Sequence, residues 1–296
     1  MFERVAFIGI GLVNGSLARD ARRLGLAGRL VGTARRQATL DQALDLGLVD
    51  EAEQDPAAAV RGADLVVLGV PVGACGEAAR AIAPGLRPDA VVTDVGSVKM
   101  RVLDLVSPHL DMRRFVPGHP IAGAETSGPA AAMDRLFRGR WCILTPRADT
   151  DPAAVERVST LWRAVGSNVE SMDAGQHDKV LAAVSHLPHL LAFAAMNTAG
   201  EVEHALQGDV LKYAAGGFRD FTRIAGADPS MWRDVFLHNK PAVLEVVGRY
   251  VENLAALQRA IRRGEADALY ERFASARAIH GREAVRRAGA TPPGTP

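Results

Sequence analysis

The fold is decided by Val5-Ala6-Phe7-Ile8-Gly9-Ile10-Gly11-Leu12-Val13-Asn14-Gly15-Ser16. An apolar run that fits a buried parallel strand is followed by two spaced glycines, and a segment with helical spacing then continues to Leu24. In this strand, turn and helix, Gly9 would allow the tight turn and Gly11 would let the backbone approach a pyrophosphate at the helix N-terminus. We therefore expect a dinucleotide here rather than an ordinary tight turn. The residues assigned to its binding are Gly9, Gly11, Leu12 and Val13.

The third position of this glycine fingerprint departs from the usual pattern. Asn14 stands there, and a glycine follows one residue later at Gly15. A glycine at the third position normally lets the helix pack closely on the strand. We expect that close packing to come from Gly15 or from Asn14 itself.

The length and composition of the chain limit which kinds of protein it can be. The chain has 296 residues, enough for two domains, and 48% of them are hydrophobic, which is ample for folded cores. Its formal charge of +1, from 35 basic and 34 acidic residues, argues against nucleic acid or a membrane surface as partner. Only Cys75 and Cys142 occur, so we expect no disulfide framework. With no signal peptide and no apolar run near the ~20 residues that span a bilayer, we predict a soluble cytoplasmic protein.

The order of patterns along the chain predicts two domains and a tail. Strand-like runs alternate with helical patterns up to Ser171, which is typical of a parallel sheet covered on both faces, and from Ala174 the patterns are helical only. We predict an α/β fold with a Rossmann-type doubly wound domain (1–171), an all-helical domain for substrate binding and homodimer formation (172–287) and a disordered tail (288–296). The expected strands are Val5–Ile8, Arg29–Thr33, Leu65–Gly69, Val91–Asp94, Phe115–Pro117, Cys142–Thr145 and Asn168–Ser171.

The end of the second strand bears on the choice of cofactor. An acidic residue about 20 positions beyond the glycines normally binds the adenosine ribose of NAD. Here the strand ends in Gly32-Thr33-Ala34-Arg35-Arg36, and the guanidinium groups of Arg35 and Arg36 suit the 2′-phosphate of NADP. The alternative is that both are solvated loop charges that stack on adenine. NAD and NADP both remain open.

Two further strand ends should border the same crevice. Val70 and Pro71 follow one strand and are predicted to form a wall for the cofactor, since a proline stiffens the turn. Ser97 follows the next strand and is either a substrate contact or the N-cap of the helix that begins near Lys99.

Histidines supply the candidate acid–base chemistry. His119 lies in a Gly- and Pro-rich loop directly after a strand, and a neutral imidazole there would accept a proton from an alcohol while hydride leaves the same carbon. His186 and His189 lie three residues apart in the helical half, near His177 and Asp178. A metal site is the alternative there, but no acidic cluster completes a coordination shell. Structural roles for these histidines also stay open.

Arginines of the helical half are candidates for binding a carboxylate. Arg219, Arg223 and Arg233 lie among Phe and Trp residues, and a dry site would strengthen an arginine–carboxylate pair. Surface ion pairs are the alternative. Residue chemistry alone thus predicts an NAD(P)-dependent oxidoreductase that acts on a small carboxylated alcohol and holds no metal.

In addition, five motifs in register resemble those of the prephenate and arogenate dehydrogenases of tyrosine biosynthesis. The resemblance runs from Val5 to about Ala284. It implies an oxidative decarboxylation in which the ring alcohol of prephenate loses hydride to the nicotinamide, carbon dioxide leaves and 4-hydroxyphenylpyruvate forms. The motifs are Gly9-Ile10-Gly11-Leu12, Asp94-Val95-Gly96-Ser97-Val98-Lys99, His119-Pro120-Ile121-Ala122-Gly123, Ser185-His186-Leu187-Pro188-His189 and Phe218-Arg219-Asp220-Phe221-Thr222-Arg223.

The resemblance also assigns roles within the site. It implies that His119 accepts the proton of the ring hydroxyl and that Ser97 bonds the same hydroxyl or orients the imidazole. On the substrate side it implies that Arg223 binds a carboxylate, that His189 is a second histidine, that Glu125 and Asp178 belong to the polar network around that arginine, and that Trp232 is a pocket wall. Ala124 departs from the Thr or Ser of many relatives.

Alternatives remain for the substrate and for the activity. Glu125 and His189 favour prephenate, and arogenate or both substrates remain possible. We expect neither an ACT domain nor a chorismate mutase segment. A regulator that has lost catalysis would have no reason to keep Ser97, His119, His189 and Arg223 together, and a 3-hydroxyacid or imine dehydrogenase would use a lysine or aspartate of the helical half.

Overall fold

The structure, a computed structural model, describes residues 1–123 and 126–289, without the side chains of 283–289. It divides into two compact units, Met1–Val243 and Leu244–Pro296. Glu125 of the predicted site lies outside the described residues, as does most of the predicted tail at 288–296.

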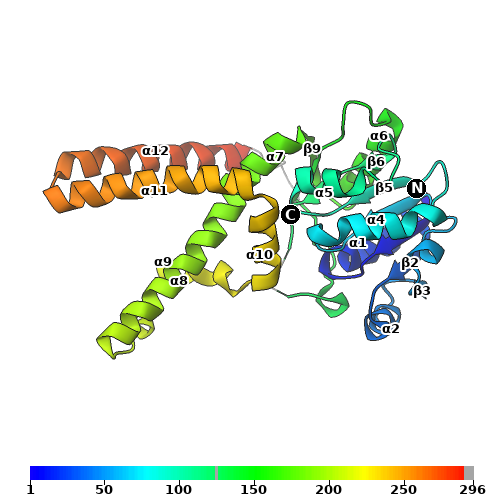
Figure 1. The fold of residues 1–296 in the computed structure, drawn as a ribbon, viewed down its shortest axis with the longest axis horizontal. Coiled ribbons are helices and arrows are strands. Elements are labelled where there is room, and N and C mark those ends of the chain that lie inside the picture. Colours follow the sequence, from blue (N-terminus) through cyan, green and yellow to red (C-terminus); the bar gives the residue numbers. More distant parts are fainter. Residues whose placement is uncertain (124–125, 290–296) are drawn as a thin grey trace. The chain divides into compact units, whose positions relative to one another are not determined.

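A six-stranded parallel sheet forms the centre of the first unit (Figure 1). Its strand order is β3-β2-β1-β4-β5-β6, so the direction of winding reverses between β1 and β4. In open sheets of this kind, ligands bind beyond the carboxyl ends of the strands at that reversal. The strands are β1 (Phe2–Ile8), β2 (Ala27–Thr33), β3 (Glu51–Glu53), β4 (Leu65–Leu68), β5 (Val91–Asp94) and β6 (Phe115–Val116).

The register brings four strand ends to one edge. Ile8 pairs with Thr33 on β2 and with Leu68 on β4, and Leu68 pairs with Asp94 on β5. The loops after these strands therefore begin side by side. They carry the glycine turn, the two arginines, the Val-Pro wall and Ser97, so the predicted cofactor residues gather at this edge.

Helices cover both faces of the sheet and bury two apolar cores. One core contains Phe7 of β1, Leu17 of α1 and Trp162 of α6. The other contains Ile8 of β1, Ile82 of α4 and Val102 of α5. Alternate residues of β1 thus point to opposite cores, as the pleat of a strand requires. The helices are α1 (Leu12–Arg23), α2 (Gln37–Asp45), α3 (Pro56–Ala59), α4 (Cys75–Ile82), α5 (Lys99–Val106) and α6 (Pro152–Ala164).

The later strands do not extend the parallel sheet, contrary to the prediction. β7 (Gly118–Pro120), β8 (Trp141–Leu144) and β9 (Asn168–Ser171) form a separate three-stranded sheet, in which β7 and β8 are antiparallel. Pro117 lies between β6 and β7 and lacks the N–H that would continue the ladder with β5, so the chain changes partner there. The predicted loop around His119 therefore begins as a strand.

After Ser171 every element of the described chain is a helix, which confirms the predicted helical C-terminal part. One π-helical turn, Ala182–His186, joins α7 to α8, and π-turns of this kind often mark functional sites. The α-helices are α7 (Ala174–Leu181), α8 (Leu187–Leu206), α9 (Gly216–Thr222), α10 (Pro229–His238), α11 (Lys240–Arg263) and α12 (Ala266–Gly289).

Helix α10 connects the helical elements of the first unit to the sheet. Its Trp232 and Val235 belong to the same apolar core as Ile8 and Leu68. It also packs against the short helix η1 (Val72–Ala74), which directly follows the predicted cofactor wall. Side chains of α10 therefore lie near the carboxyl end of β4.

The stretch Ala174–Leu206 has 33 residues and contains an 18-residue window with a mean hydropathy of 1.4, which meets the length and composition of a membrane-spanning helix, and only 22% of that window is buried. This differs from the expectation that no segment is long and apolar enough. Length and composition are weak grounds for a span, because helices of soluble proteins pass the same test. This stretch also carries His177, Asp178, His186 and His189 of the site described below.

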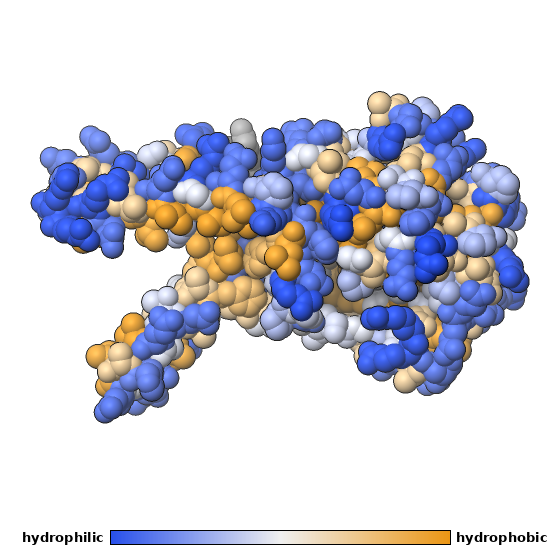
Figure 2. Space-filling model, viewed as in Figure 1, coloured by the Kyte–Doolittle hydropathy of each residue, from blue (hydrophilic) through white to orange (hydrophobic). Residues whose placement is uncertain are grey.

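The second unit begins within α11 and contains α12. A turn at Gly264 joins the two helices. Figure 2 shows hydrophobic residues at the surface along α11. The large apolar side chains exposed in this unit are those of Leu244, Val251, Leu254, Ile261, Tyr270, Phe273 and Ile279.

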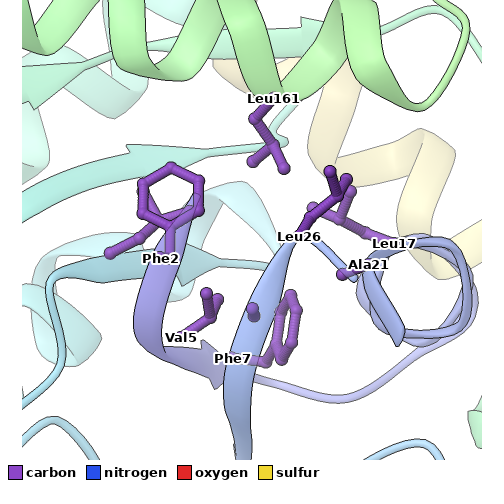
Figure 3. A pocket seen from close by; sticks show the side chains of 9 residues that line it. Phe2, Val5, Phe7, Leu17, Ala21, Leu26 and Leu161 are labelled. Atoms are coloured by element: carbon purple, nitrogen blue, oxygen red, sulfur yellow. The ribbon is translucent and has the colours of Figure 1, made fainter. Parts of the chain in front are cut away.

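A small apolar gap lies against one face of β1 (Figure 3). Phe2, Val5 and Phe7 surround it together with Leu17 of α1 and Leu161 of α6. Its volume of about 10 Å³ barely holds one water, and no polar group lines it. It is a packing defect and not a ligand site.

Candidate active site

The glycine turn has the form that a pyrophosphate requires. Gly9 has a φ of +85°, and a Cβ there would lie 2.8 Å from the carbonyl oxygen of Gly69, so only glycine fits. At Gly11, the N-cap of α1, a Cβ would meet no described atom within 4 Å. The backbone is thus open to a ligand at the helix N-terminus, where N–H groups and the helix dipole favour a phosphate.

Asn14 and Gly15 together replace the third glycine of the fingerprint, which normally lets the helix pack closely on the strand. The buried Asn14 amide donates to the carbonyl oxygens of Gly9, at 2.7 Å, and Val67, at 3.2 Å, and so ties the ends of β1 and β4 together. A Cβ at Gly15 would lie 2.9 Å from the Cβ of Ala132. Asn14 therefore holds the turn, while Gly15 allows the close approach of a neighbouring segment.

The other predicted cofactor residues flank this turn. Arg35 and Arg36 are exposed just beyond β2, and Arg36 is the N-cap of α2. Val70 is half-buried, with Cγ1 3.1 Å from where a Cβ of Gly9 would stand, and the exposed Pro71 is the N-cap residue of η1. These residues and the glycine turn fit a bound dinucleotide.

A buried ion pair fixes the start of β7. The side chains of Asp94 and Lys99 are fully buried and joined at 2.5 Å, and the Lys99 ammonium also donates to the carbonyl oxygen of Gly118 at 2.5 Å. Asp94 accepts the backbone N–H groups of Gly96 and Gly118 at 2.8 and 3.2 Å. Because Gly118 directly precedes His119, this pair sets the position of that histidine.

His119 is the end of a chain of hydrogen bonds. Its Nδ1 lies 2.8 Å from Nε2 of His177, and Nδ1 of His177 lies 2.8 Å from Oδ1 of Asp178. The pKa of His119 lies well below its ordinary value, chiefly because burial removes water from the ring and also because His177, Lys99 and His186 add positive charge. A neutral imidazole at neutral pH can act as a proton acceptor.

Asp178 caps helix α5, and this changes the interpretation of Ser97. Its two carboxylate oxygens accept the N–H groups of Lys99 and Met100 at 2.8 and 2.9 Å. The N-cap residue of α5 is Val98, which makes no side-chain cap. The alternative that Ser97 is the N-cap is therefore wrong, and Ser97 lies half-buried in the loop after β5. Both contacts of the Asp178 carboxylate are thus within the protein, to the N-terminus of α5 and to the His177 ring.

A second histidine cluster lies on the π-turn and α8. The amide nitrogen of Asn239 donates to the Asp178 carbonyl oxygen at 2.8 Å and contacts Nδ1 of His186 at 3.1 Å. Burial lowers the pKa of His186 to about 4, although Asp178 opposes the shift. His189 donates from Nδ1 to the Ser185 carbonyl oxygen at 3.0 Å.

Trp232 joins this cluster to the core. It stacks on His189 with ring centroids 3.6 Å apart and meets His186 edge-on at 6.0 Å. Only 7% of Trp232 is exposed, so it forms a rigid wall beside His189. Hydrogen bonds and ring contacts thus run continuously from His119 to His189.

The structure places Arg223, one of the predicted arginines, near the histidine cluster. Arg223 begins the short helix η6 (Arg223–Gly226), which packs against α8, the helix that carries His189. That places Arg223 among the helical elements around His189. The convergence of Arg223 and His119 on one ligand stays a prediction. Among the described residues, no group of three or more His, Cys, Asp or Glu is arranged to hold a metal ion.

Sequence reasoning missed several members of the site. The sequence pattern gives no role to His177 beyond its place beside Asp178. It also gives no role to Asp94 and Lys99 beyond their places at the two ends of a motif. The signal in the sequence is the spacing of Asp94 and Lys99, an acid at the end of an apolar strand and a lysine five residues later. Asn239 carries no signal, because its partners lie 53 and 61 residues away.

Comparisons with known proteins agree with this geometry. The family model described as "Prephenate dehydrogenase, nucleotide-binding domain" matches residues 17–171, and "Prephenate dehydrogenase, dimerization domain" matches residues 173–275. A cyclohexadienyl dehydrogenase of Zymomonas mobilis is 37% identical, over 92% of this chain and 93% of its own. A prephenate dehydrogenase of Bacillus subtilis is 33% identical, over 99% of this chain and 79% of its own.

A solved structure gives the same result. The prephenate dehydrogenase of Aquifex aeolicus, in complex with hydroxyphenyl propionate and NAD+, has a TM-score of 0.87 and 36% identity, and the match covers 95% of this chain and 98% of that one. The cofactor cradle, the helical C-terminal part and these matches agree, and the chain belongs to the prephenate dehydrogenase family, as an NAD(P)-dependent dehydrogenase.

Proposed function

We propose that this enzyme oxidises and decarboxylates prephenate to 4-hydroxyphenylpyruvate, with residues 1–171 binding the cofactor and residues 172–287 completing the substrate site. The observation that carries the proposal is the position of His119 on β7, close to the ligand edge of the sheet, where burial holds the pKa of its imidazole well below the ordinary value. Names among the relatives support the same chemistry, since two of them are called prephenate and cyclohexadienyl dehydrogenases.

The chemistry needs one proton acceptor. The nicotinamide, when bound, accepts the hydride from the carbinol carbon. His119 accepts the hydroxyl proton at Nε2 as that carbon becomes a carbonyl. Departure of carbon dioxide returns the electrons of the broken C–C bond to the ring, and the oxygen becomes a phenolate that takes its proton back from His119. The cycle leaves the imidazole neutral, and aromatisation supplies the driving force, so positioning dominates the catalysis.

The remaining predicted residues would position the substrate. In this proposal the Arg223 guanidinium binds a substrate carboxylate, and His189, stacked on Trp232, contacts the substrate from the helical side. Ser97 would donate to the ring hydroxyl from the loop after β5. Glu125 is retained as a proposed contact, although it lies outside the described residues.

Arogenate is the second candidate substrate. The relative of Zymomonas mobilis is named for cyclohexadienyl compounds in general. The test is to cross prephenate and arogenate with NAD and NADP, and to measure reduced cofactor and the aromatic product. Turnover of prephenate supports the proposal. Turnover of arogenate alone would move the assignment to arogenate, and turnover of neither would refute it.

We also propose that the enzyme is a cytoplasmic homodimer. The matched dimerization-domain model covers residues 173–275, and helices α11 and α12 expose seven large apolar side chains, including Leu254 and Phe273. Exposed apolar surface of this kind marks interfaces between proteins. Light scattering after gel filtration should give twice the chain mass of 31.4 kDa, and a monomer would refute the proposal.

A further inference from the structure

The hydrogen bonds around Asp178 determine where its neighbours carry protons. Both oxygens of this carboxylate accept backbone N–H groups, from Lys99 and Met100, and Oδ1 also lies 2.8 Å from Nδ1 of His177. A carboxylate that accepts an N–H group at each oxygen acts as an acceptor. His177 Nδ1, 2.8 Å from Oδ1, must be the donor of that bond.

The proton on His177 in turn determines which nitrogen of His119 carries a proton. The His177 side chain is completely buried, and each of its ring nitrogens has one partner, His119 at Nε2 and Asp178 at Nδ1. We infer that His177 carries a single ring proton, the one on Nδ1 that it donates to Asp178, and its Nε2 is then bare. That nitrogen can only accept, so His119 donates to it from Nδ1 at 2.8 Å. Because His119 is itself neutral, its Nε2 is then bare.

We propose that His177 and Asp178 are positioning residues that hold His119 in the tautomer with a bare Nε2, ready to accept the substrate proton. This inference rests on the proposed function of His119 as that acceptor. It also gives Asp178 a different role from the predicted one, because its carboxylate acts through His177 and the α5 cap instead of in a polar network around Arg223.

The arrangement also stabilises the charge that forms during turnover. When His119 takes the proton at Nε2, its Nδ1–H is held by His177, whose own Nδ1–H points at the Asp178 carboxylate. Two cationic or titratable groups nearby oppose that charge, namely Lys99, which is paired with Asp94, and His186. The negative end of the chain offsets them, as the aspartate does in a Ser-His-Asp triad.

The proton positions can be read directly by NMR. In a two-bond ¹H–¹⁵N correlation spectrum of the protein labelled with ¹⁵N-histidine, a protonated and a bare ring nitrogen have distinct shifts. The His119→Asn variant identifies the His119 signals among the eight histidines. We expect His119 in the unmodified enzyme to carry its proton on Nδ1 at neutral pH. A proton on Nε2 would overturn the proposal, and this reading needs no activity and no folded His177 variant.

Kinetics test the consequence. His177→Leu removes the acceptor and should lower kcat about 10²-fold, with little change in KM for substrate or cofactor. His177→Gln places an amide oxygen near the position of Nε2 and should recover kcat to within about tenfold of the unmodified enzyme. His109→Leu, at an exposed histidine after α5, is the matched control and should not change kcat. Unchanged kcat in His177→Leu would overturn the proposal, whereas a parent enzyme without turnover would overturn only the proposed function.

Discussion

The cofactor cradle and the His119 centre lie at the same end of the sheet but are built in opposite ways. The cradle is backbone: Gly9 and Gly11 leave room, and the ligand meets N–H groups at the start of α1. The His119 centre is made of side chains that are mostly buried and that pair with one another through Asp94, Lys99, His177 and Asp178. An open backbone site is specified by a short local motif, whereas a buried polar centre needs partners from distant elements.

The largest effect is expected from removing the proton acceptor. His119→Asn should lower turnover of prephenate by about 10²–10⁴-fold, because no other group replaces the imidazole. Binding of the cofactor to the glycine turn should stay within about twofold, which titration of cofactor fluorescence measures. Normal turnover in this variant would show that His119 is not the acceptor.

Breaking the buried ion pair should mainly affect stability. Lys99→Met leaves the fully buried Asp94 carboxylate without its cation and should cost about 3–5 kcal/mol in the free energy of unfolding. Urea denaturation measures this, with Lys179→Met, at an exposed lysine of α7, as the control. Equal stability of the two variants would contradict the role given to Lys99.

Alanine at Gly9 tests whether the backbone of the turn needs glycine, and alanine at Gly11 tests whether a ligand occupies the space beside the turn. Gly9→Ala places a Cβ 2.8 Å from Gly69 O at a φ of +85° and should destabilise the fold by about 1–3 kcal/mol. Gly11→Ala meets no described atom and should leave stability unchanged while weakening the cofactor about tenfold. If Gly11→Ala binds the cofactor normally, the pyrophosphate does not lie there.

The smallest effect is expected from the arginines beyond β2. Replacing Arg35 and Arg36 by Ala should raise KM for NADP about tenfold and leave KM for NAD nearly unchanged, if the guanidinium groups hold the 2′-phosphate. Steady-state kinetics with both cofactors measure the ratio. An equal change for both cofactors would indicate that the arginines stack on adenine instead.

The same contrast explains what could be predicted from the sequence. The glycine turn, the alternation of strands and helices up to β6 and the helical part after Ser171 depend on local spacing, and the structure confirms them. The second sheet could not be predicted, because the change of partner at Pro117 depends on a strand more than 20 residues away. The cap that Asp178 places on α5 joins residues 78 and 79 positions apart, so a lone acid in a helix gave no sign of it.

The pH dependence of kcat/KM with prephenate tests the central claim most directly, since it reports the free enzyme's essential base. Activity requires neutral His119, so it is full above the pKa of His119 and falls as pH drops through it. Because burial and neighbouring charge hold that pKa well below the ordinary value of 6.5, we predict a profile that stays level from pH 8 to below 6.5 and declines only at lower pH. A decline that begins above 6.5 would contradict a neutral, buried imidazole as the proton acceptor.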